Sequence, residues 1–124
     1  MEKNLLVFTA IFEGATGVAL LVMPAMFASL LLGASLDGPG AVTVAHVAGA
    51  ALLSIALMCW LARDDGQTRT GRAVIAGLVV YNLAVAAVLV HAGLVLGITG
   101  IGLWPAVGAH GVLSVWCFAS LRRQ

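Results

Sequence analysis

Three histidines lie within apolar stretches of the sequence, and their side chains are suited to metal or haem ligation. If these stretches are membrane helices, His46, His91 and His110 all lie on the order of 8 to 12 Å below the same membrane boundary, at about 1.5 Å per residue. Met23 reaches a similar depth. Imidazole and thioether ligands suit copper, zinc or iron, and two facing histidines can hold a haem b. We therefore predict a shared transition-metal or haem b site. The alternative is three separate hydrogen bonds across helix contacts.

The position of Glu13 in the first apolar run predicts a second polar layer, closer to the other membrane boundary. Ser54 and Ser114 have matching depths on their own helices, so the three side chains could meet. Apolar surroundings favour the protonated carboxyl, which then hydrogen-bonds to a hydroxyl such as that of Ser54 or Thr16. This layer is expected to lie at least two helical turns from the histidines.

One helix carries two polar residues that cannot both face the bundle interior. Asn82 and His91 are half a turn apart by angle on an ideal helix. Asn82 shares its stripe with leucine and valine residues that look like lipid contacts. We therefore expect His91 and Tyr81 to face inward and Asn82 to face elsewhere.

The elements that position these residues follow from composition. Of the 124 residues, 62% are hydrophobic and 9% are charged, whereas a soluble domain is about one quarter charged. The chain is therefore predicted to be an all-α integral membrane four-helix bundle, formed by one domain over 1–124. Pro24 favours a break followed by a short interfacial helix, although one long kinked span is an alternative. The predicted segments are 5–23, the interfacial helix 24–32, 41–62, 73–96 and 102–121.

The basic residues indicate how the bundle is oriented. All six occur in the N-terminal tail, the 63–72 connection or the C-terminal tail. The positive-inside rule then places both termini in the cytoplasm, in an up-down-up-down arrangement. We expect a multi-pass protein of the bacterial inner membrane. The sequence has no run of basic residues that would indicate nucleic-acid binding. The expected partners are therefore the lipid bilayer and other membrane subunits or a second copy.

Two resemblances bear on function. The segment 12–17 with its glutamate, together with the number of spans, resembles the small multidrug resistance transporters, whose glutamate alternately binds protons and a cationic drug. The third predicted span, 73–96 with Tyr81-Asn82, lacks the aromatic-glycine pattern expected of that family.

The second resemblance covers most of the chain. A glycine, an apolar run and Pro24 followed by Leu-Leu-Gly occupy 17–33, and Ala-His-Val-Ala-Gly-Ala-Ala-Leu-Leu closing at Trp-Leu-Ala-Arg occupies 45–63. With Leu-Trp-Pro to Trp-Cys over 103–117, these segments resemble the small bacterial four-span proteins of the DoxX-like kind. That group has no single chemistry, so the resemblance implies the fold and no catalytic role.

The function that the sequence predicts is binding rather than catalysis. No phosphate-binding loop, hydrolase motif or paired-cysteine motif occurs, and no catalytic residue is expected. We therefore expect a binding or accessory protein with the outer-leaflet histidine site. The alternatives are a proton-coupled small-molecule transporter that uses Glu13 and a purely structural subunit of a larger membrane complex.

Overall fold

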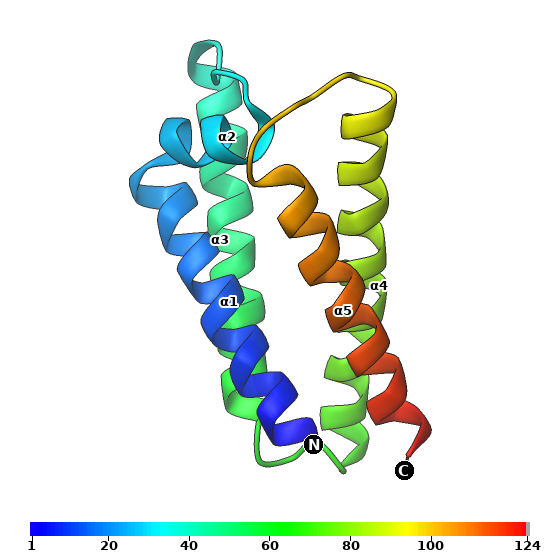
Figure 1. Ribbon diagram of the computed structural model, residues 1–124. Coiled ribbons are helices and arrows are strands. Elements are labelled where there is room, and N and C mark those ends of the chain that lie inside the picture. Colours follow the sequence, from blue (N-terminus) through cyan, green and yellow to red (C-terminus); the bar gives the residue numbers. More distant parts are fainter. Residues whose placement is uncertain (124) are drawn as a thin grey trace.

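The apolar runs of the sequence form helices in the computed structural model, which describes residues 1–123 (Figure 1). Within this range the prediction of an all-helical chain is confirmed. Four of the helices are long and apolar enough to cross a membrane. The helices are α1 (Glu2–Val22), α2 (Pro24–Leu32), α3 (Gly38–Ala62), α4 (Arg69–Leu94) and α5 (Leu103–Arg122).

The first long apolar run is broken into two helices. Met23 separates α1 from α2 with φ −137° and ψ 56°, outside the helical region. Pro24 follows at the first position of α2, where its missing N–H is no loss. Gly33 ends α2 in the left-handed conformation, with φ 66°. The chain thus forms a separate short helix here instead of one long kinked span.

The bundle consists of two closely packed helix pairs, α1 with α3 and α4 with α5. Small residues allow the closest approach of α1 and α3: a Cβ atom at Gly17 would lie 2.8 Å from the Gly49 carbonyl oxygen, and the reverse substitution meets the same distance. Packing across the two pairs is sparser. Helices in lipid associate largely through such packing. The two helices within each pair are therefore held together more strongly than the two pairs are.

Two apolar clusters lie at different heights in the bundle. The first, near the chain termini, includes Leu5, Cys59, Ile75 and Cys117, and both cysteines are free thiols. The second is built around Leu89, Ala92 and Leu103, toward the opposite end. Along α1, α4 and α5, the residues between the two clusters include polar side chains.

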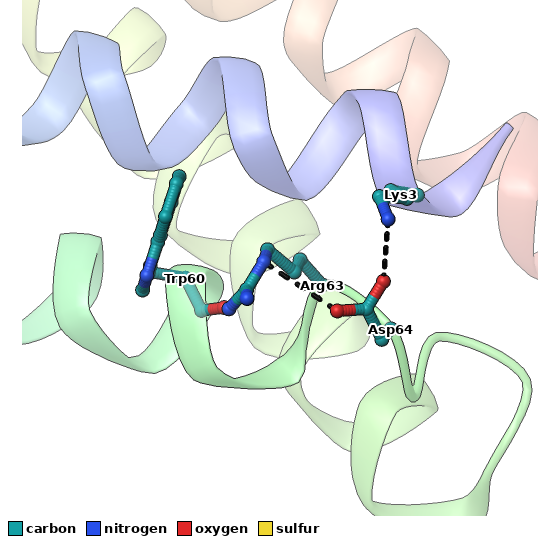
Figure 2. Close-up of polar contacts among 4 residues, drawn as sticks. All are labelled: Lys3, Trp60, Arg63 and Asp64. Carbon is teal, nitrogen blue, oxygen red and sulfur yellow. Dashed lines mark hydrogen bonds and ion pairs between the residues drawn. The ribbon is translucent and has the colours of Figure 1, made fainter.

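Charged residues link α1 to the α3–α4 connection at the end of the bundle that holds the N-terminus (Figures 1 and 2). Lys3 of α1 lies 2.7 Å from Asp64, and Arg63 lies 3.5 Å from the same carboxylate. The Arg63 guanidinium also lies over the Trp60 ring, 4.5 Å from its centre. The hydrogen bond from Lys3 holds the pKa of Asp64 below its usual range.

The opposite end is joined through the backbone. The Gly102 amide, at the start of α5, donates a 2.8 Å hydrogen bond to the Leu30 carbonyl of α2. Gly100 lies so close to the Leu31 carbonyl that any Cβ atom there would overlap it. The short helix α2 therefore connects the two helix pairs at this end.

Candidate functional site

A buried polar layer, formed by Glu13, Tyr81, Asn82 and His110, lies between the two apolar clusters. Glu13 of α1 is 1% exposed, and the Tyr81 hydroxyl of α4 donates a 3.0 Å hydrogen bond to its Oε2 atom. The second oxygen, Oε1, has no hydrogen-bond partner among residues 1–123. An unpaired buried polar atom costs about 1–3 kcal/mol. Oε1 is therefore a buried atom of this layer with unused bonding capacity.

The other half of the polar layer is a hydrogen-bonded pair whose proton positions follow from its partners. The Asn82 amide Nδ2 donates to the Leu78 carbonyl at 2.8 Å, which leaves Oδ1 as an acceptor. His110 Nδ1 lies 2.8 Å from Asn82 Oδ1 and so carries the proton of this bond. In a neutral imidazole the other nitrogen is then an acceptor. Asn82 thus fixes the tautomer of His110 and directs Nε2 to accept.

Aromatic contacts connect the two halves of the layer. The His110 ring packs edge-to-face against Phe12, with centroids 5.9 Å apart, and against Tyr81, with centroids 5.7 Å apart. Phe12 belongs to α1, Tyr81 to α4 and His110 to α5. The layer therefore draws on both helix pairs and lies where they meet.

A cavity of about 150 Å³ opens beside this layer. Glu13, Tyr81 and His110 line it together with apolar side chains that include Phe12 and Phe27. The volume is close to that of a protein cavity known to hold benzene. The space therefore fits one aromatic ring, and one of the residues that line it, Glu13, has an unpaired carboxyl oxygen.

The predicted three-histidine site is not assembled. His110 is buried in the cavity wall, but His46 and His91 are exposed on α3 and α4. Met23 is 45% exposed, between α1 and α2. No group of three His, Cys, Asp or Glu side chains in the described part of the chain is placed to hold a metal ion. Similar depth on separate helices did not ensure similar orientation.

The predicted partners of Glu13 are also corrected by the structure. Ser54 is exposed and donates to the Ala50 carbonyl, one turn back on its own helix. Thr16 likewise donates to the carbonyl of Phe12. Of the predicted second layer, Ser114 is buried, and its hydroxyl donates to the His110 carbonyl. Serine and threonine hydroxyls within a helix can bond to the carbonyl one turn back, and these three do so instead of reaching Glu13.

The expected orientation of α4 is wrong for Asn82 and His91. Asn82 is fully buried and His91 is exposed, whereas Tyr81 contacts the interior as predicted. The sequence did hold a signal for this orientation, in the spacing of the buried residues of α4. They recur at the three- and four-residue intervals of a packed helix seam: Gly71, Ile75, Leu78, Asn82, Leu89 and Ala92.

Glu13 and His110 were expected in separate layers, yet they line one cavity. The expectation counted depth from the end of each helix, which holds only if the helices run parallel and end at the same level. In the structure α1 has 21 residues and ends at Val22, α4 has 26 residues, and α1 and α5 run obliquely to α3 and α4 (Figure 1). Depth counted along one helix therefore does not transfer to another.

Comparison with protein families, with curated proteins and with solved structures finds no match to the chain. The resemblance to DoxX-like proteins therefore stays a prediction. Function is therefore inferred from the geometry of the polar layer and its cavity.

Proposed function

We propose that this chain is a membrane protein that binds a small ring-shaped molecule in the cavity beside Glu13. The single observation that carries the proposal is the unpaired Oε1 atom of a glutamate that is 1% exposed and lines that cavity. Leaving such an atom unpaired is costly. A ligand that hydrogen-bonds to this atom removes that cost, which favours binding.

The chemistry of the wall selects the polar group of the ligand. Neutral His110 presents Nε2 as an acceptor, and a protonated Glu13 presents an O–H, because Oε2 already accepts from Tyr81. A hydroxyl group both donates and accepts, so it suits both neighbours. A phenol-like molecule, one ring with one hydroxyl, matches the volume and the polarity of the site.

The proposal also covers the orientation of the bundle and the membrane that holds it. Lys3 and Arg63 lie at the bundle end that holds the N-terminus (Figure 2), and Arg122 closes α5. Cationic residues gather on the cytoplasmic side of membrane proteins. We place both termini in the cytoplasm and the protein in a bacterial inner membrane, with the lipid bilayer as its first partner.

A second candidate function is proton-coupled transport. It is favoured by the hydrogen bond from Tyr81 to Glu13, which crosses between the two helix pairs. A cationic ligand that displaced the Glu13 proton would act on that contact. Binding and movement between the pairs would then be coupled at one atom.

The test compares probes built on one ring: benzene, phenol and benzylamine. Each is titrated into the purified protein in lipid nanodiscs, and saturable thermal stabilisation is measured. Phenol is expected to bind more tightly than benzene. The Glu13→Leu variant should weaken phenol binding about tenfold, the equivalent of about 1.4 kcal/mol for one buried hydrogen bond.

The matched control is Ser54→Ala, which removes a hydroxyl from an exposed position on α3, outside the cavity wall. It should bind phenol as the wild type does. Equal phenol binding by Glu13→Leu and wild type would overturn the proposal. Preference for benzylamine with release of a proton would favour the transporter, and no saturable binding of any probe would favour a structural subunit.

A further inference from the structure

The cavity adjoins a groove on the surface of the bundle. This groove, about 430 Å³, lies between α1, α2 and α5, and we name it the α2–α5 groove. Five residues line both the groove and the cavity: Phe12, Thr16, Phe27, Leu31 and Ala106. The groove and the cavity therefore share part of one wall, and a molecule whose ring occupies the cavity has the groove as its neighbouring space.

The groove wall is apolar. Leu30, Pro105 and Ala109 complete it, and the one hydroxyl, that of Thr16, is already bonded to the Phe12 carbonyl. α1 and α5 are both long and apolar enough to cross a membrane, and we expect the part of the groove between them to face hydrocarbon. A lipid chain there can be exchanged for another apolar chain at little cost, whereas a charged or hydrogen-bonding chain would lose its solvation.

A rival groove, the α3–α4 groove of about 410 Å³, lies on the opposite helices. It is lined by residues that include Met58, Ala73 and Gly77, and it shares only Tyr81 with the cavity among the lining residues described. The Tyr81 hydroxyl is held by Glu13. The α3–α4 groove therefore adjoins the cavity at Tyr81 alone, whereas the α2–α5 groove shares five lining residues with it.

The geometry points to a ligand that is an amphiphile, with a ring and hydroxyl in the cavity and an apolar tail in the α2–α5 groove, entering from the lipid. This inference rests on the proposed function and adds the substrate class and the path of entry. An amphiphile suits this path better than a water-soluble ligand does, because the apolar α2–α5 groove offers no free hydrogen-bonding group. Neither Glu13 nor His110 contacts the tail.

The test uses para-octylphenol with a photoreactive diazirine at the end of its chain, in nanodiscs that hold the full chain. After irradiation, mass spectrometry is expected to find the label on α2 or α5, near Leu30 or Ala109. Excess phenol should remove the label, because both molecules place a ring in the same cavity. Labelling near Met58 or Ala73 instead would overturn the inference.

Filling each groove gives an independent measurement. The Ala109→Phe variant should weaken para-octylphenol binding about fivefold or more, while leaving phenol binding unchanged, because overpacking affects only the tail. Ala73→Phe, the same substitution in the α3–α4 groove, is the matched control and should change neither. The smaller Ala109→Leu variant repeats the test if the phenylalanine disturbs folding.

The outcomes separate the two proposals. If phenol itself does not bind, the proposed function fails. If phenol binds but Ala109→Phe and Ala109→Leu leave para-octylphenol binding intact, the site stands and the tail path is wrong. Loss of para-octylphenol binding in Ala73→Phe alone assigns the tail to the α3–α4 groove and also overturns the inference.

Discussion

Tyr81 and Glu13 are 68 positions apart in the sequence, and their side chains meet at 3.0 Å in the middle of the bundle. Tyr81 belongs to the α4–α5 pair and Glu13 to the α1–α3 pair. Clusters of buried apolar residues lie on either side of this contact along the bundle. A hydrogen bond is directional, whereas apolar packing is not. The Tyr81–Glu13 bond therefore specifies the alignment of the two pairs more strictly than apolar packing alone.

The first prediction concerns this alignment. Tyr81→Phe should lower the free energy of unfolding by about 0.5–2 kcal/mol, because the Glu13 carboxyl loses its partner. In a Glu13→Leu background the same change should cost less than about 0.5 kcal/mol, since the interaction is already gone. Unfolding by sodium dodecyl sulfate in mixed micelles measures both values. Additive losses would show that the two residues are not energetically coupled.

The second prediction separates the histidines. Asn82→Leu should cost about 1–3 kcal/mol, because it leaves His110 Nδ1 unpaired in the interior. His46→Ala and His91→Ala remove exposed side chains and should change the unfolding free energy by less than about 0.5 kcal/mol. The same unfolding assay compares the three variants. A large loss in either exposed position would indicate that a partner or a ligand covers it.

The third prediction concerns the closest helix contact. Gly17→Ala places a methyl group 2.8 Å from the Gly49 carbonyl, so it should destabilise the protein by about 1–3 kcal/mol. Gly77→Ala is the control, because nothing lies within 4 Å of a Cβ atom there. Its stability should be unchanged or slightly increased. Equal stability of the two variants would contradict the close packing of α1 on α3.

The fourth prediction is a pH dependence at the Lys3–Asp64 pair. The pKa of Asp64 is lowered in the folded protein by the Lys3 hydrogen bond. The pair therefore contributes stability above the ordinary aspartate pKa of about 4, and this contribution is lost as the pH falls below that value. Hydrogen exchange at the start of α1 should be faster in Asp64→Asn than in wild type at pH 7, with the difference shrinking in acid and in high salt. A difference independent of pH would exclude the ion pair as its cause.

The fifth prediction tests orientation. Ser35→Cys and Gln67→Cys place reactive thiols at exposed positions in the two connections at opposite ends of the bundle. A membrane-impermeant maleimide added to intact cells should label position 35 and spare position 67, if the basic end is cytoplasmic. The buried native thiols, Cys59 and Cys117, should contribute little background. The reverse labelling pattern would invert the topology.

Helical class and approximate helix limits could be predicted because apolar length and proline position act locally. The site could be predicted only in part: Glu13 and His110 were identified by residue type, but their meeting depends on the tilt and length of different helices. Asn82 was misplaced because its stripe of leucines was taken as lipid contact, although the spacing of Leu78, Asn82 and Leu89 is that of a buried seam. The cavity itself arises from α2, whose Phe27 and Leu31 contribute to its wall.

The hydrogen bond from Gly102 to Leu30 has a consequence for biosynthesis. α2 leaves the ribosome early, but the amide that fixes it belongs to the last helix. The wall that α2 supplies to the cavity is therefore completed only after α5 has been inserted. A chain that stops before α5 would carry Glu13 but would lack the part of the cavity wall that Ala106 and His110 supply.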